Sequence, residues 1–285
     1  MTIVVTGATG HLGRLVIESL LSRGVEPDQL VAAGRSVEKI ADFAGRGVTV
    51  ARLDYDDPAT LEHVFTGADM VLLISASEVG HRLQQHVNVI DAAVVAGVGR
   101  IVYTSAPHAD DTALVLAPEH KATEEAIRES GLPFTILRNG WYTENYVSVL
   151  EQARTTGTVV ASVGAGRVAS ASRADYADAA AVVLTENGHA GQVYELAGDV
   201  AWSFADLAEA ISGIAGRSVE YTPVSPDEHV RILTDAGMDA GTAGFVIALD
   251  GNIRDGLLGE TGGELRTLIG RPTTPLAEGL RAAIG

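Results

Sequence analysis

The sequence predicts an α/β protein with a doubly wound parallel sheet, and three observations support this prediction. Short apolar, β-branched runs alternate with helical stretches through the first half of the chain, which is the rhythm of consecutive βαβ units. A glycine-rich turn follows the first of these runs. The 285 residues, 46% of them hydrophobic, are enough to bury a substantial core.

The first predicted strand, Thr2–Val5, leads into a turn that contains Gly7, Gly10 and Gly13, and apolar residues at helical spacing follow from Arg14. Strand, turn and helix in this order indicate a Rossmann-type dinucleotide site rather than a merely tight turn. Glycines let the backbone approach a pyrophosphate, and the free N–H groups at the helix start offer partial positive charge to its oxygens. We therefore expect this turn to bind a nucleotide.

The segment after the second predicted strand indicates which nucleotide binds. A site for NAD usually places an acidic side chain there, but no Asp or Glu lies between Leu30 and Ser36. Arg35 occupies that place, and Lys39 follows within a predicted helix, Val37–Ala44. Such cations favour the extra 2′-phosphate of NADP(H), although both also fit the alternative of ordinary surface residues. The expected cofactor is NADP(H).

The remaining elements continue the alternation as far as Asn139 and then become less regular. The predicted strands of this part are Val48–Leu53, Met70–Ser75, Arg100–Ser105 and Phe134–Asn139, and the helices are Pro58–Phe65, Leu83–Ala96 and Pro118–Ser130. Beyond them we predict helices at Glu144–Thr155, Ala174–Glu186, Phe204–Ala215 and Leu276–Ile284, and strands at Val159–Val163 and Val193–Leu196. The last helix either covers the lobe or contacts a second copy in a homodimer.

These elements predict a Rossmann-type nucleotide-binding domain at residues 1–140. Residues 141–285 are expected to form a smaller C-terminal substrate lobe that is interleaved with the last sheet strands, with a cleft between the two parts.

Ligands of such sheets bind beyond the carboxyl ends of the strands, so the residues after each strand are candidates. Ser75, Ala76 and Ser77 follow the fourth strand, and their small size permits close approach of a cofactor. The segment Asn139–Tyr146 follows the sixth strand and combines amide, hydroxyl and aromatic groups. This segment is suited to a nicotinamide edge and a flat substrate, and an aromatic plug between the lobes is the alternative.

Composition excludes several classes of function. The formal net charge of −17 argues against nucleic-acid and anionic-membrane partners. The absence of cysteine excludes disulfides and thiolate chemistry, and the spacing of His81 and His86 does not suit a metal site, so no metal is expected. With neither a signal peptide nor a membrane-length apolar span, a cytoplasmic location is expected.

Six motifs, spread over nearly the whole chain, carry a resemblance to a known family. They are the glycine turn Thr6–Gly13, Ile74–Gly80, His108–Asp110, Leu137–Tyr146, Ala169–Ala177 and Tyr194–Asp199. Together they resemble the bacterial NAD(P)H:quinone oxidoreductases of the NmrA-like, atypical short-chain dehydrogenase family, to which the triphenylmethane reductases are close.

This resemblance implies flavin-free, NADPH-dependent reduction of a small quinone or a similar flat acceptor. The cofactor-binding residues that it implies are Gly7, Ala8, Thr9, Gly10, His11, Leu12, Arg35, Ser75, Ala76, Ser77, Asn139, Gly140, Trp141, Tyr142, Thr143, Glu144 and Arg173. The chain departs from the family pattern at His11, at Ala76 and at Ala106-Pro107, and the last of these borders the expected substrate region.

The mechanism is constrained by the absence of a Tyr-x-x-x-Lys pair, the acid and base of ordinary short-chain dehydrogenases. A quinone that accepts hydride becomes a weakly basic phenolate, so positioning of the reactants can suffice. Tyr103, His108 and His120 are the candidate proton or hydrogen-bond donors. Two alternatives remain open at this point: a redox sensor that binds NADP(H) with little catalysis, and a reductase of other flat electrophiles.

Overall fold

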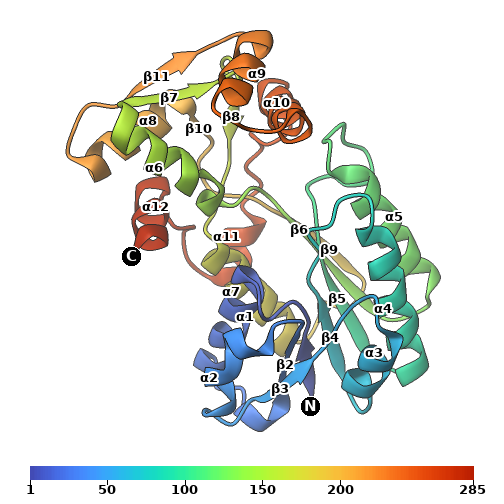
Figure 1. Ribbon diagram of the computed structural model, residues 1–285. Coiled ribbons are helices and arrows are strands. Elements are labelled where there is room, and N and C mark those ends of the chain that lie inside the picture. The colour runs from blue at the N-terminus through green and yellow to red at the C-terminus, as the bar shows by residue number, and fades with distance from the viewer. The chain divides into compact units, whose positions relative to one another are not determined.

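Figure 1 shows the computed structural model, which describes residues 1–285 and divides into two compact units. Unit 1 contains residues 1–110, 116–139 and 173–196, and unit 2 contains residues 111–115, 140–172 and 197–285. The chain thus leaves unit 1 at residue 139 and returns to it for one more helix and one more strand. The residues of this return, 173–196, lie in the segment that the sequence analysis assigned to the C-terminal lobe.

Unit 1 is built on a seven-stranded sheet with the order β3-β2-β1-β4-β5-β6-β9. All neighbouring strands run parallel. The strands are β1 (Ile3–Val5), β2 (Leu30–Gly34), β3 (Thr49–Arg52), β4 (Met70–Leu73), β5 (Arg100–Ser105), β6 (Phe134–Asn139) and β9 (Gln192–Leu196). The strand order reverses between β1 and β4, which confirms the predicted doubly wound, Rossmann-type sheet.

Helices cover both faces of this sheet (Figure 1), with α1 packed on α7 and with α3, α4 and α5 packed in series. The helices of unit 1 are α1 (His11–Ser22), α2 (Ala41–Ala44), α3 (Pro58–Phe65), α4 (Arg82–Ala96), α5 (Ala117–Glu129) and α7 (Arg173–Thr185), with short 3₁₀ turns η1 (Pro27–Gln29) and η2 (Val37–Ile40). Because both faces are covered, every residue of β5 is buried. The predicted helix Val37–Ala44 is divided into η2 and α2.

Unit 2 consists of helices around two small sheets, in which β7 pairs parallel with β11 and β8 pairs antiparallel with β10. Its elements are η3 (Thr143–Tyr146), α6 (Val147–Thr156), β7 (Thr158–Ala161), β8 (Arg167–Val168), β10 (Trp202–Ser203), α8 (Phe204–Ala215), β11 (Glu220–Pro223), α9 (Pro226–Asp235), α10 (Ala240–Arg254), α11 (Glu264–Ile269) and α12 (Leu276–Ile284). None of the helices in either unit combines the length and apolar character that a membrane crossing needs.

Helix α10 was not predicted, because its sequence carries Gly241, Gly244 and Gly251, which lower intrinsic helix propensity. Its amino end nevertheless has a local signal, since the Asp239 side chain accepts a hydrogen bond from the backbone N–H of Thr242. Tertiary contacts support the helix further along. Buried Asp250 accepts hydrogen bonds from the backbone and hydroxyl of Ser162 and lies 3.0 Å from Nδ1 of His229. Helix α10 is thereby held to α9 and to the residue that directly follows β7.

Candidate cofactor and active site

The glycine turn between β1 and α1 has the geometry that a pyrophosphate requires. Gly7 has a φ of +60°, a conformation that suits glycine. A Cβ on Gly13 would lie 2.5 Å from the carbonyl oxygen of Gly7, so only glycine permits this approach of helix to strand. Helix α1 begins without a side-chain cap and without an acidic residue in its first turn. Its first N–H groups are therefore available to an anion.

Arg35 lies beside this turn because the end of β2 packs closely against it. A Cβ on Gly34 would lie 2.7 Å from Cγ2 of Thr9, which shows how near the strand end is to the turn. The next residue, Arg35, is exposed, and its Nη1 donates to Oε1 of Glu78 at 2.8 Å. Lys39 is also exposed, in η2. Arg35, the residue expected to bind the 2′-phosphate, therefore lies next to the glycine turn that is expected to bind the pyrophosphate.

The loop that follows β4 is held by buried side chains. The backbone N–H of Ser75 donates to Oγ1 of Thr104, and that of Ala76 donates to Nε2 of His86, both at 2.9 Å. Since Nε2 accepts, the proton of neutral His86 is on Nδ1, which lies 2.9 Å from Oγ1 of Thr123. Burial lowers the pKa of His86 to about 3, with a smaller effect from the Arg82 charge. The loop conformation therefore depends on a neutral imidazole.

Tyr103 and His120 form a buried pair between β5 and α5. The hydroxyl of Tyr103 lies 2.8 Å from Nδ1 of His120, and the Tyr103 side chain has no exposed surface. His120 Nε2 accepts from Nη1 of Arg82 at 3.4 Å, which leaves the ring proton on Nδ1. Burial raises the pKa of Tyr103 and lowers that of His120 to about 3. A buried, neutral imidazole engaged at both nitrogens is a poor proton donor to a substrate, so this geometry argues against direct roles for these two candidates.

His108, the third candidate, has a different environment. It is the one non-glycine residue with a positive φ, 47°, a conformation that costs a side-chain-bearing residue about 1–2 kcal/mol. The conformation is held by Glu195 of β9, whose Oε2 accepts from the His108 backbone N–H at 3.1 Å. Ring atom Nδ1 lies 3.6 Å from Oε1 of Glu195, and the side chain is 38% exposed. His108 is thus anchored through its backbone while its ring remains accessible.

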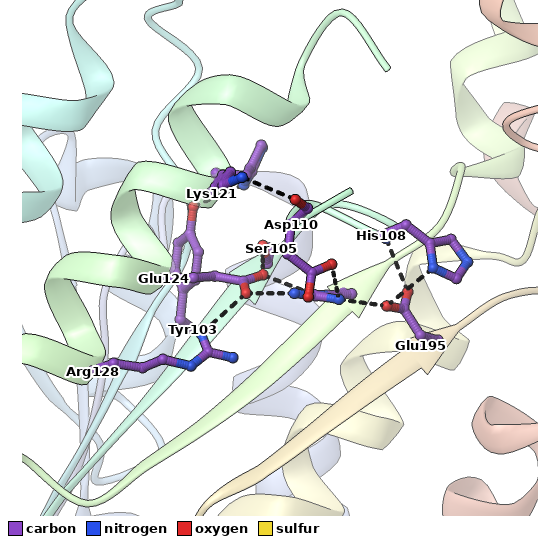
Figure 2. A network of polar contacts seen from close by, with 10 residues as sticks. Tyr103, Ser105, His108, Asp110, Lys121, Glu124, Arg128 and Glu195 are labelled. Carbon is purple, nitrogen blue, oxygen red and sulfur yellow. Dashed lines mark hydrogen bonds and ion pairs between the residues drawn. The ribbon is translucent and has the colours of Figure 1, made fainter. Parts of the chain in front are cut away.

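Figure 2 shows a polar network that includes His108, Asp110, Glu124 and Glu195. Arg138 of β6 lies within this network and is surrounded by carboxylates. Glu124 of α5 accepts two hydrogen bonds from Arg138, at 2.9 and 2.7 Å, and Glu195 accepts one at 2.8 Å. Asp110 lies 2.8 Å from the same guanidinium, which lowers the pKa of Asp110. The Ser105 hydroxyl donates to Glu124 at 2.6 Å. The network joins the carboxyl ends of β5, β6 and β9.

Buried Asn139 is the last residue of β6 in unit 1, and the segment that follows it, Gly140–Tyr146, belongs to unit 2. Within unit 2, Trp141 and Thr143 exchange backbone hydrogen bonds with Ala171, and the Thr143 hydroxyl lies 2.8 Å from that of Ser170. Gly140, Trp141, Tyr142 and Glu144 are partly exposed. Tyr146 instead packs edge-on against Trp202, with ring centroids 4.8 Å apart, so its ring contributes to the unit 2 core.

The structure therefore groups the candidates by location. Gly7 to Leu12, Arg35 and Ser75 to Ser77 lie at the carboxyl edge around β1, and Asn139 and His108 lie at the ends of β6 and β5. Arg173 is the first residue of α7, also in unit 1. No group of three or more His, Asp or Glu side chains is arranged to hold a metal ion.

Glu78, Glu124 and Glu195 are polar partners that the sequence reasoning did not single out as site residues. The sequence carried a local signal for the partners of Arg138. This charged residue lies inside a buried strand, and a buried charge requires a partner of opposite sign.

Comparisons with known proteins agree with this geometry. Residues 1–248 match the NmrA-like family. Quinone oxidoreductase 2 of Escherichia coli K12 is 46% identical over 276 residues, which cover 97% of this chain and 96% of that protein. The NAD(P)H azoreductase of Xenophilus azovorans is 29% identical over 85% of this chain and 83% of its own length.

Solved structures show the same similarity. The NADPH-dependent quinone oxidoreductase of E. coli in complex with NADPH superposes with a TM-score of 0.94, at 44% identity and full coverage of both chains. The Citrobacter triphenylmethane reductase complexed with NADP(H) has a TM-score of 0.93, at 39% identity, with 99% of this chain and 100% of that chain covered. With the family model covering most of the chain and a relative well above 30% identity, this chain belongs to the NmrA-like family.

Proposed function

We propose that this protein reduces quinones, or similarly flat acceptors, with NADPH and without a flavin. The observation that carries the proposal is the exposed Arg35 beside the glycine turn, which leads into the uncapped amino end of α1. In this proposal the first N–H groups of α1 would bind the pyrophosphate and the neighbouring Arg35 would bind the 2′-phosphate. The similarity to the E. coli quinone oxidoreductase that binds NADPH supports both the cofactor and the acceptor class.

The residues that would hold NADPH are those implied by the family resemblance, and the environments of the glycine turn and of Arg35 suit this cofactor. The first N–H groups of α1 would bind the pyrophosphate, and the Arg35 guanidinium would bind the 2′-phosphate. The backbone around Ser75, Ala76 and Ser77, the segment from Asn139 to Glu144, and Arg173 would complete the contacts. When bound, NADPH supplies a hydride from its nicotinamide ring.

We assign the donor role toward the acceptor oxygen to His108. Of the three candidates, it has the accessible ring, because Tyr103 and His120 are buried against each other. Nδ1 faces Glu195, and we assign the contact with the substrate oxygen to Nε2 of this partly exposed ring. A donor at this point stabilises the phenolate that develops as the quinone is reduced. Glu195 is then a positioning residue that holds the His108 backbone.

The first test is to purify the protein free of flavin and follow oxidation of NADPH, beside NADH, on addition of a simple benzoquinone. We expect saturable consumption that favours NADPH. Tight NADPH binding with no consumption above the uncatalysed rate would contradict quinone reduction. That result would favour the redox-sensor alternative or a different acceptor.

The second test is His108→Ala, with His63→Ala as the control because His63 is an exposed histidine on α3. We expect kcat to fall about tenfold to a hundredfold with little change in the affinity for NADPH, since a lost proton or hydrogen-bond donor acts on the chemical step. Measuring kcat across pH in both variants separates a lost donor from a general loss of fold. An unchanged kcat would remove His108 from the mechanism.

A further inference from the structure

The Arg35–Glu78 ion pair crosses the place where a dinucleotide would enter. Strands β2 and β4 are the two neighbours of β1 in the sheet, with Val4 of β1 paired to Val31 of β2 and to Val71 of β4. Arg35 follows β2, and Glu78 lies in the loop that follows β4. Their contact therefore bridges over the carboxyl end of β1, where the glycine turn begins.

The Glu78 carboxylate is held in position by a buried side chain. Nε2 of Gln85, a residue only 3% exposed, donates to Oε2 of Glu78 at 3.2 Å and to Oδ2 of Asp56 at 2.8 Å. The other carboxylate oxygen, Oε1, accepts from Arg35. The Glu78 backbone carbonyl also accepts from the N–H of Arg82 at 2.9 Å, at the start of α4. Glu78 is therefore presented to Arg35 by fixed elements on the opposite side of β1.

We propose that Glu78 is a specificity-determining residue, whose carboxylate competes with the 2′-phosphate of NADPH for the guanidinium of Arg35. The inference rests on the proposed function, because it requires that Arg35 bind this phosphate. A phosphate carries more charge than a carboxylate and binds arginine with the same forked geometry, so it displaces Glu78. The displaced carboxylate stays tied to Gln85 and repels the phosphate. NADH has a 2′-hydroxyl at this point, which does not need the cation.

The magnitude follows from the exposure of the pair. The side chains of Arg35 and Glu78 are 60% and 42% exposed, and such exposed pairs contribute little free energy. Removing the competing charge is therefore expected to tighten NADPH binding by about two- to fivefold. The chain offers a matched control in Arg46 and Glu18, an exposed pair of 43% and 40% at 2.7 Å.

The test measures dissociation constants by calorimetry for Glu78→Gln and for Glu18→Gln. The ligands are NADPH and NADH, and the adenosine fragments 2′,5′-ADP and 5′-AMP, which differ only in the 2′-phosphate. For Glu78→Gln we expect about two- to fivefold tighter binding of NADPH and 2′,5′-ADP and little change for NADH and 5′-AMP. In Glu18→Gln all four constants should stay unchanged. The gain should disappear when Glu78→Gln is combined with Arg35→Ala, because the competition needs the guanidinium.

The remaining outcomes overturn the inference in distinguishable ways. An equal gain for ligands with and without the 2′-phosphate would mean that the ion pair obstructs any nucleotide. No gain for any ligand would mean that Glu78 does not compete. If the wild-type protein binds 2′,5′-ADP no more tightly than 5′-AMP, the assignment of Arg35 in the proposed function fails first. If the wild-type protein binds NADPH but does not reduce quinones, the proposed reaction is wrong, and the binding constants still decide whether Glu78 competes for Arg35.

Discussion

Two arginines on the carboxyl edge of the same sheet differ in how deeply they are buried and in how many carboxylates bind them. Arg138, at the end of β6, is 6% exposed in its side chain and is bound by Glu124, Glu195 and Asp110. Arg35, just past β2, is 60% exposed and pairs with Glu78. Both are guanidinium groups with carboxylate partners, so the chemistry is the same and the environment differs.

An ion pair can be exchanged for a ligand only where opening it costs little free energy. Removing the buried Glu124 carboxylate would leave the buried Arg138 guanidinium with less compensation, and that is costly in a poorly solvated site. Opening the exposed pair at Arg35 costs little, because water solvates both partners. We therefore interpret the β5–β6–β9 end of the edge as a rigid support and the β1–β2 end as the part that binds an anion.

The largest effect is expected on the free energy of unfolding, when the Arg138 network at the β5–β6–β9 end is weakened. Glu124→Gln keeps the shape of the side chain but removes the charge from the twofold contact with Arg138. We expect the free energy of unfolding to fall by about 3 kcal/mol, because a buried guanidinium loses part of its compensation. Chemical denaturation measures this loss. Glu125→Gln, at the exposed neighbouring position, is the control, and an equal effect of both variants would contradict the distinction.

The second prediction concerns pH and the two buried histidines, His86 of α4 and His120 of α5. Burial lowers the pKa of His86 and of His120 to about 3, whereas unfolded histidine titrates near 6.5. Below about pH 6.5 the unfolded chain binds protons that the folded chain does not, so stability falls as pH decreases towards 3. Each histidine should remove about 1.4 kcal/mol per pH unit in this window.

Denaturation at several pH values between 6.5 and 4.5 tests this prediction in the wild type and in His120→Gln. The variant should show a shallower dependence of unfolding free energy on pH. A slope that is the same in both proteins would show that His120 is not neutral and buried in the folded state.

The third prediction concerns Arg35, at the β1–β2 end of the sheet edge. Arg35→Ala should weaken NADPH binding by about tenfold to a hundredfold, the value of a charge-assisted contact to phosphate, and leave NADH binding and stability nearly unchanged. Arg46→Ala removes a similarly exposed arginine with one carboxylate partner and should affect neither ligand. Titration of both cofactors into both variants is the measurement. An equal loss of affinity for NADPH and NADH would mean that Arg35 contacts a part of the cofactor other than the 2′-phosphate. Glu78→Gln is the smallest of these effects and has the opposite sign.

Much of the fold could be predicted because its signals are local. Arg100–Ser105, Phe134–Asn139 and Pro58–Phe65 have the predicted bounds. Each strand is built around a short apolar run, Ile101-Val102 or Ile136-Leu137, and Pro58 begins a helix capped by Asp57. β11 was not predicted and ends in Pro223. It forms by pairing with β7, which lies about sixty residues earlier in the chain.

The candidate site divides in the same way. The nucleotide turn and Arg35 could be recognised because the glycine spacing and the residue that follows a strand are patterns only a few residues long. His108 was one of three equal candidates, and burial separated it from Tyr103 and His120. Its anchor Glu195 lies 87 residues away in sequence, so no local pattern links the two.

The alternation of strands and helices, the glycine turn and the cation beside it can be predicted from the sequence alone, because each follows from backbone sterics and side-chain chemistry within a short window. Which charges are buried and which are exposed depends on the tertiary structure. It placed Arg138 among three carboxylates and left Arg35 with an exposed partner. The physical reason is that solvation of a charge depends on everything packed around it, and those neighbours come from distant parts of the chain.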